Sequence, residues 1–234
     1  AASKSRAVER EDMGSLRKNS EESLPERLGL LYAQGRRALG GDFGMLKTLA
    51  GLLLRRQGWI VEGEAPPVAR CVVVAAPHTS NWDLLYLLLM AWSKGLKISW
   101  LAKHSLFWPP LGWVLRALGG VPVVRHRPEQ RVSATAALFG AVARLYLVIP
   151  PEGTRSRTAH WKSGFYWIAR AAEVPVQLTA LDYATKAGTF GPLLDASASP
   201  STFMDQVRAF YAGRHGRYPD DFGPVRLEDE GDGS

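Results

Sequence analysis

Short apolar runs alternate with amphipathic stretches from residue 58 onward. The runs are rich in β-branched and aromatic residues, which is typical of buried strands. Strands are predicted at residues 59–62, 71–76, 97–101, 121–125, 145–150 and 176–181. Helices are predicted between them, at residues 82–93, 111–118, 129–144 and 164–172. This alternation predicts an α/β fold with a mostly parallel central sheet flanked by helices.

The chain before residue 58 has a different pattern. Residues 1–24 are densely charged, and we expect this leader to be disordered. Residues 25–57 predict two N-terminal helices, at residues 25–39 and from residue 43 onward. The second has a wide apolar stripe with Lys47, Arg55 and Arg56 beside it. Such a helix can lie in a membrane interface or pack on the domain core, and both interpretations stay open.

One compact domain is expected at residues 58–219, since a chain of this length suits a single domain. Near its end, the spacing of Phe203, Val207 and Tyr211 predicts a further amphipathic helix. Residues 220–234 contain six acidic residues and one arginine. We expect this acidic tail to be disordered.

The body of the chain is strongly basic. Residues 27–219 contain 23 lysines and arginines and 10 acidic residues, a net charge of +13. This excess indicates an anionic partner, such as membrane lipid or a phosphorylated substrate. Nucleic acid is not expected, because aromatic and basic residues are not interleaved. No apolar run approaches the roughly 20 residues that cross a bilayer, so a cytoplasmic protein, peripheral on the inner face of the cell membrane, is predicted.

His78 and Asp83 form an H-x-x-x-x-D motif directly after the predicted strand at 71–76. An imidazole can accept a proton near neutral pH, and a carboxylate can orient it and stabilise the imidazolium. The spacing fits a histidine in a loop and an aspartate in the first turn of the next helix. It also suits a structural histidine, and the residues alone leave both interpretations open.

A second motif, Glu152-Gly153-Thr154-Arg155, follows another predicted strand. Gly153 permits a tight turn or the close approach of a ligand. Arg155 offers a forked set of donors that suits a phosphate, and Arg125 is a second candidate at the end of its own strand. Ligands bind beyond the carboxyl ends of strands in sheets of this type, so both motifs are expected in one cleft.

Aromatic residues crowd residues 92–113. They fit either the core or an apolar groove for a fatty acyl chain. Phe107, Trp108 and Trp113 are expected to face the groove or the membrane, because Pro109-Pro110 interrupts the segment.

Several other classes of site lack their sequence signals. There is no G-x-S-x-G motif, no Walker loop and no G-x-G-x-x-G motif. Histidine and cysteine do not cluster at metal-ligand spacing, so no metal site is expected. The single cysteine, Cys71, is expected to be a buried strand residue rather than a nucleophile.

Four blocks in order resemble the glycerophospholipid acyltransferases, the family that includes lysophosphatidic acid acyltransferase. The blocks are His78–Asp83, Gly119–Arg125, Glu152–Ser156 and Val174–Leu178. The resemblance covers about residues 58–217. The run Trp161-Lys162-Ser163-Gly164-Phe165-Tyr166 looks like a short bacterial branch of the family.

The resemblance implies transfer of a fatty acyl group from acyl-CoA or acyl carrier protein, as co-substrate, to the hydroxyl of a lysophospholipid such as 1-acylglycerol-3-phosphate. It implies His78 as general base and Asp83 as its orienting partner, with no cofactor and no metal. Positions that match the family's acceptor-binding residues are Arg125, Glu152, Gly153, Thr154 and Arg155. Another lipid acceptor, thioesterase activity and a non-enzymatic basic lipid-binding protein remain as alternatives.

Overall fold

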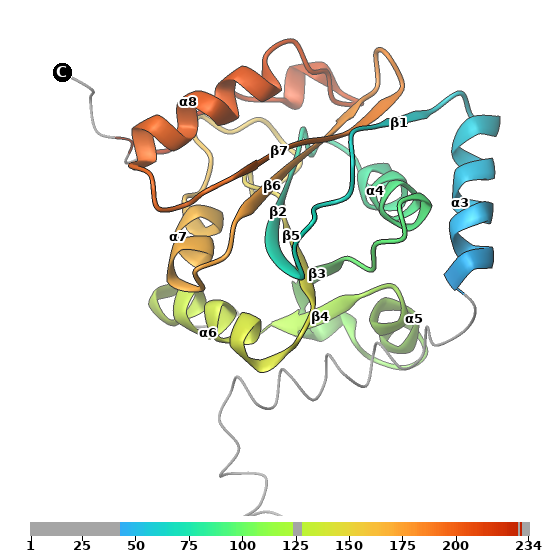
Figure 1. Ribbon diagram of the computed structural model, residues 1–234, viewed down its shortest axis with the longest axis horizontal. Coiled ribbons are helices and arrows are strands. Elements are labelled where there is room, and N and C mark those ends of the chain that lie inside the picture. The colour runs from blue at the N-terminus through green and yellow to red at the C-terminus, as the bar shows by residue number, and fades with distance from the viewer. Residues whose placement is uncertain (1–42, 124–127, 229, 231–234) are drawn as a thin grey trace, which may run out of the picture.

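Residues 43–123, 128–228 and 230 are described by a computed structural model, in which seven strands form one sheet between two layers of helices (Figure 1). The leader at 1–24, the predicted helix at 25–39 and Arg125 lie outside the described residues. Across the sheet the strand order is β1-β7-β6-β2-β5-β3-β4. The strands are β1 (Ile60–Glu62), β2 (Arg70–Ala76), β3 (Ser99–Lys103), β4 (Gly120–Val123), β5 (Leu145–Ile149), β6 (Val176–Asp182) and β7 (Ala187–Leu194).

The central part of the sheet is parallel. β6, β2, β5, β3 and β4 pair as parallel neighbours, whereas β7 runs antiparallel to β6 and β1 pairs with β7. This confirms the predicted α/β fold with a mostly parallel sheet. The sequence did not predict β7, because Gly188, Gly191 and Pro192 interrupt its apolar residues.

The helices follow the sequence pattern closely. The one predicted at 129–144 begins one residue earlier and ends three residues earlier, at Ala141. Ser199 caps the last helix, because its side chain accepts a hydrogen bond from the Thr202 amide. The α-helices are α3 (Phe43–Arg56), α4 (Trp82–Ser93), α5 (Leu111–Ala117), α6 (Pro128–Ala141), α7 (Gly164–Ala171) and α8 (Pro200–Tyr211), and two short 3₁₀ helices are η1 (His104–Leu106) and η2 (Pro219–Asp221).

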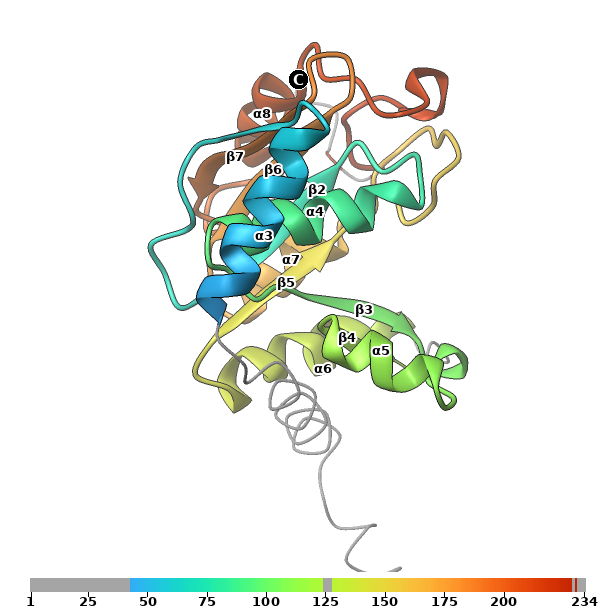
Figure 2. The ribbon, with the colours of Figure 1, turned by 90° about the vertical axis from the view of Figure 1, so that its right-hand side faces the viewer.

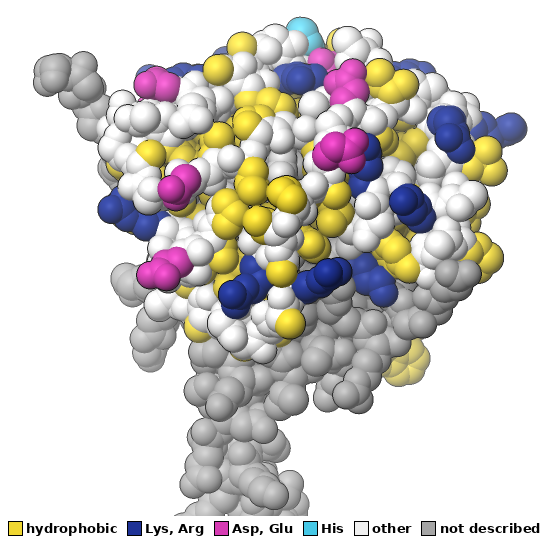
Figure 3. All heavy atoms as spheres, viewed as in Figure 1, with side chains coloured by type: hydrophobic (Ala, Val, Ile, Leu, Met, Phe, Trp, Pro, Cys, Tyr) yellow, Lys and Arg dark blue, Asp and Glu magenta, His cyan; other side chains and the backbone are white. Residues whose placement is uncertain are grey.

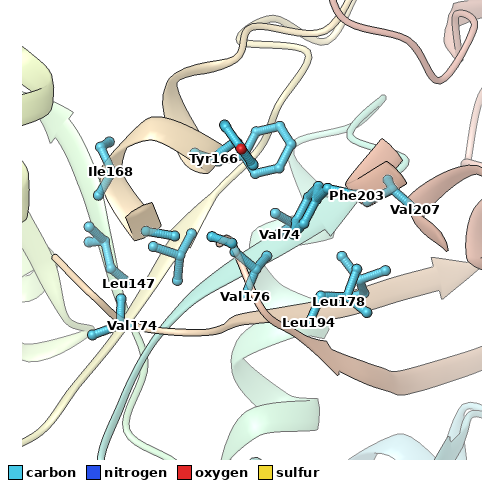
Figure 4. Close-up of a cluster of buried hydrophobic side chains, with 14 of the residues drawn as sticks. Val74, Leu147, Tyr166, Ile168, Val174, Val176, Leu178, Leu194, Phe203 and Val207 are labelled. Carbon is cyan, nitrogen blue, oxygen red and sulfur yellow. The ribbon is translucent and has the colours of Figure 1, made fainter. Parts of the chain in front are cut away.

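Alternate side chains of β2 enter two different apolar clusters, one on each face of the sheet. Val72 and Val74 belong to the cluster that β5 and β6 form with α7 and α8, which Figure 4 shows. Cys71 and Val73 belong to the other, which α3 and α4 cover (Figure 2). Cys71 is fully buried and burial raises the pKa of its thiol to about 12, as expected for a strand residue in the core.

Only one side of the apolar stripe of helix α3 packs against the domain. Ala50 and Leu54 are buried in the cluster shared with α4. Met45, Leu49 and Leu52 are about half or more exposed. The stripe is therefore wider than the core requires. In the part of the chain that the structure describes, no helix is long and apolar enough to cross a membrane.

The described part of the acidic tail, residues 220–228 and 230, is folded against the domain, so the expectation of disorder is wrong there. Leu227 is buried and forms a bridge with Trp161. Arg226 accepts a hydrogen bond from the Trp161 amide at 2.7 Å through its carbonyl oxygen. Backbone contacts that the sequence pattern does not reveal hold this segment. We call residues 213–228 the C-terminal strap.

Candidate active site

The two sequence motifs meet where neighbouring strands end. β2 and β5 are parallel neighbours, so the loops that follow them leave the sheet at the same edge. In Figure 2 the arrowheads of β3 and β5 point to the right-hand side of the view, where this edge lies. The His78 amide donates a hydrogen bond to Glu152 Oε1 at 2.9 Å, which joins the motifs directly. The structure therefore brings the two motifs into one site.

The His78 ring folds back onto Asp83, in the arrangement that the five-residue spacing predicts. Nδ1 of His78 lies 3.2 Å from Oδ2 of Asp83, which is in the first turn of α4. The same Oδ2 accepts hydrogen bonds from the amides of Thr79 and Ser80, each at 2.8 Å. These bonds tie the loop to the helix. A ring that donates from Nδ1 keeps the Nε2 lone pair for a substrate proton.

The Asp83 carboxylate has a further partner that sequence reasoning missed. Tyr183 Oη donates a hydrogen bond to Oδ1 at 2.7 Å. Tyr183 follows directly after the last residue of β6, which pairs with β2 in parallel. The sequence did contain a signal for Tyr183 as a site residue, because it is a polar aromatic residue directly after a fully buried strand.

Glu152 is buried behind the His78 backbone. Its burial raises the pKa of the carboxyl to about 7, which outweighs the lowering by hydrogen bonds from its own amide and from His78. Oε2 is buried and has no hydrogen-bond partner among the described residues. Glu152 does not line the cavity beside His78, which favours support of the loop over direct contact with an acceptor.

A cavity of about 590 Å³ opens beside His78, within the usual size of a ligand pocket. Most of its wall comes from apolar side chains on the central strands and α4, including Leu84, Leu87, Trp100, Leu101, Val148 and Leu181. Its polar lining includes His78, Asn81, Lys103, Thr154, Arg155 and Ser156. The largely apolar wall of the cavity thus also carries two cationic side chains, Lys103 and Arg155.

Three predicted binding residues of the second motif lie on the cavity wall. Gly153 has a φ of +67°, a conformation that favours glycine, and the Lys162 side chain packs over it. Thr154 accepts a hydrogen bond from the Ser156 amide. Arg155 donates a hydrogen bond to the Asn81 side chain, which links this turn to the H-x-x-x-x-D loop. Arg125, which follows β4, lies outside the described residues.

The aromatic segment divides between the core and the surface. Phe107 is buried and does not line the cavity, and the Arg116 guanidinium lies 5.2 Å from its ring centroid, so the expectation that it faces the groove or the membrane is wrong. Trp108 and Trp113 are 59% and 67% exposed. Leu106, just before them, lines the cavity and is partly exposed. Two indole side chains therefore project from the surface close in sequence to the cavity wall.

Comparison with known proteins identifies the family of this chain. A family model described as Acyltransferase matches residues 59–180, more than half of the chain. No curated protein matches. The crystal structure of the 1-acyl-sn-glycerophosphate (LPA) acyltransferase PlsC from Thermotoga maritima superposes with a TM-score of 0.50 and 18% identity, over 74% of this chain and 81% of that one. That likeness concerns the fold. Because the family match spans both motifs, the chain belongs to the Acyltransferase family, as its four sequence blocks predicted, and is an acyltransferase.

Proposed function

We propose that this acyltransferase moves a fatty acyl group from acyl-CoA or acyl carrier protein to the hydroxyl of a lysophospholipid such as 1-acylglycerol-3-phosphate, with His78 as general base. The observation that carries this proposal is the His78–Asp83 pair, 3.2 Å apart, on the wall of a largely apolar cavity. The pair supplies a base, and the cavity supplies room for an acyl chain.

The chemistry follows from the pair. Nε2 of His78 takes the proton of the acceptor hydroxyl while the oxygen attacks the thioester carbonyl. The carbon–sulfur bond then breaks, and the imidazolium returns the proton to the departing thiolate. Asp83 stabilises the imidazolium between these steps. Because the Thr79 and Ser80 amides are bonded to Asp83, the donors that hold the oxyanion must come from other groups.

The cationic part of the cavity suits the acceptor phosphate. Arg155 and Lys103 both line the cavity, and a guanidinium can bind two phosphate oxygens at once. The hydrogen bond to Asn81 orients the Arg155 side chain beside the loop that carries His78. Arg125 remains a predicted second phosphate ligand.

The apolar part of the cavity suits the fatty acyl chain. Its wall includes Leu84, Leu87 and Val148, and burying each methylene of a chain against such a surface gains about 0.8 kcal/mol. The donor carrier itself would remain outside, since the cavity is open beside His78. No cofactor takes part in this scheme.

The enzyme acts as a peripheral protein on the inner face of the cell membrane. Exposed tryptophans favour the interface between lipid headgroups and acyl chains. Trp108 and Trp113 follow Leu106, which is on the cavity wall, so docking through them would bring the cavity to its lipid acceptor. The exposed apolar residues of α3 offer a further contact.

A product assay tests the proposal. Purified protein is mixed with labelled acyl-CoA and lysophosphatidic acid in mixed micelles, and the lipids are resolved. Labelled phosphatidic acid is the expected product. Free fatty acid in its place would mean that water is the acceptor and that the protein is a thioesterase, while a different labelled lipid in a panel of lysophospholipids would assign another acceptor.

A further inference from the structure

The Asp83 carboxylate accepts hydrogen bonds on both of its oxygens. Oδ2 faces the Thr79 and Ser80 amides and the His78 ring, and Oδ1 faces the hydroxyl of Tyr183 at 2.7 Å. We propose that Tyr183 is a positioning residue for the catalytic pair, which holds the carboxylate in the orientation that presents Oδ2 to His78. The inference rests on the proposed role of His78 and extends it to a residue outside both motifs.

The three donors around Oδ2 lie at different distances from it. The two amides bond Oδ2 at 2.8 Å, and His78 Nδ1 is farther from it, at 3.2 Å. Turning the carboxylate toward the amides would therefore weaken the contact to the ring first. A bond from Tyr183 to Oδ1 resists that rotation. Because the Asp83 side chain is only 6% exposed, little water is available to replace the missing donor.

Tyr183 is itself held in place from several sides. Its amide donates a hydrogen bond to the His215 carbonyl at 2.9 Å, which anchors it to the C-terminal strap. Its ring packs edge-on against Trp59 and Tyr86, with centroid distances of 5.1 and 5.9 Å. The Arg217 guanidinium lies 6.0 Å from the ring centroid. The hydroxyl therefore reaches Asp83 from a fixed ring.

Tyr183 is suited to permanent donation. Burial, and next the hydrogen bond to Asp83, raise the pKa of its phenol well above the ordinary value. The phenol keeps its proton throughout the physiological range. Its role is therefore to orient Asp83, and proton transfer stays with His78.

The test is Tyr183→Phe, which keeps the ring and removes the hydroxyl. The expected result is a kcat lowered by roughly 10- to 100-fold, the range for losing a hydrogen bond to a charged group, with KM for both substrates nearly unchanged. The matched control is Tyr86→Phe. This change removes a hydroxyl from the same aromatic cluster, but one that donates to Gln57 Oε1 at 2.6 Å. Tyr86→Phe is expected to keep kcat within about twofold of the wild type.

Outcomes separate this inference from the proposed function. A Tyr183→Phe variant with wild-type kcat would overturn the inference, as would equal losses in Tyr183→Phe and Tyr86→Phe, which would indicate general loosening of the cluster. His78→Ala is assayed in parallel. If His78→Ala is inactive while Tyr183→Phe is unaffected, the inference fails alone. If His78→Ala keeps full activity, the proposed function fails.

Discussion

Two buried carboxyl groups lie behind His78, and their surroundings give them different properties. Asp83 accepts hydrogen bonds on both oxygens, from two amides and a phenol, and its Oδ2 lies 3.2 Å from Nδ1 of the imidazole. Glu152 accepts a bond from the His78 amide, while its second oxygen has no hydrogen-bond partner among the described residues. Burial accordingly raises the pKa of Glu152 to about 7. Asp83 can serve as the charged partner of His78. Glu152 supports the loop, and its burial lowers the free energy of unfolding by an amount that depends on pH.

The Glu152→Gln change is predicted to stabilise the protein at high pH. Below the ordinary pKa of 4.5 the carboxyl is protonated in both folded and unfolded chains. Between pH 4.5 and 7 the unfolded chain loses this proton more readily than the folded one, so stability falls as pH rises. Glutamine does not titrate. The unfolding free energy of Glu152→Gln, relative to wild type, should therefore increase by roughly 2–3 kcal/mol from pH 5 to pH 8.

Denaturant unfolding at several pH values measures this difference. Glu173→Gln is a suitable control, since it makes the same exchange at an exposed carboxyl. A difference between Glu152→Gln and wild type that stays constant from pH 5 to pH 8 would contradict the account of Glu152.

Among the elements, the C-terminal strap connects the parts of the site. The Tyr218 amide bonds the Thr79 hydroxyl at 3.2 Å, next to His78. Arg157 donates to the Phe222 carbonyl at 2.8 Å, beyond the Glu152 turn. The His215 carbonyl receives the Tyr183 amide. One segment thus contacts the loop that carries His78, the chain just after the Glu152 turn, and Tyr183.

Gly223→Ala is predicted to loosen the strap. A Cβ at this position would lie 2.1 Å from the Thr158 carbonyl oxygen, which is too close for the backbone to remain in place. The cost is about 1–3 kcal/mol, as for other overpacked sites. Hydrogen exchange of the amides in residues 152–162 should become faster and the Tm should fall. Gly164→Ala is the control, because no atom lies within 4 Å of its added Cβ, and equal exchange in the two variants would count against the strap's role.

Local sequence predicts some of these elements and not others. The strand and helix around His78 were predictable, because β2 is a continuous apolar run and α4 begins after Thr79-Ser80-Asn81. The meeting of His78 with Glu152 followed from parallel strand ends. The positions of β7, the C-terminal strap and Tyr183 were not predictable from local sequence, because they depend on contacts between distant residues, such as Trp161 with Leu227. Phe107 was misjudged for the same reason.

On the scale of the whole molecule, the charge excess does not by itself identify a lipid-binding face. The face in Figure 3 carries lysines and arginines interspersed with acidic side chains. The exposed indoles of Trp108 and Trp113 are a more specific feature, since they follow a residue of the cavity wall. Docking through them would explain how a cavity of this kind meets a substrate that resides in a bilayer.

The double variant Trp108→Ala/Trp113→Ala is predicted to bind vesicles that contain phosphatidylglycerol about tenfold or more weakly, because two exposed aromatic contacts with lipid are lost. Vesicle sedimentation measures the binding. Trp167→Ala is the matched control. The Trp167 indole is 44% exposed and lies next to Arg170 on α7, which covers the face of the sheet opposite to α3 and α4. Unchanged binding of the double variant would remove this surface from the account.

The most direct test of the central claim compares wild type with His78→Ala in the product assay with labelled acyl-CoA and lysophosphatidic acid. The account predicts labelled phosphatidic acid from the wild type and a rate lower by about 100-fold or more from the variant, with its thermal unfolding nearly unchanged. A His78→Ala variant that forms phosphatidic acid at the wild-type rate would contradict the account.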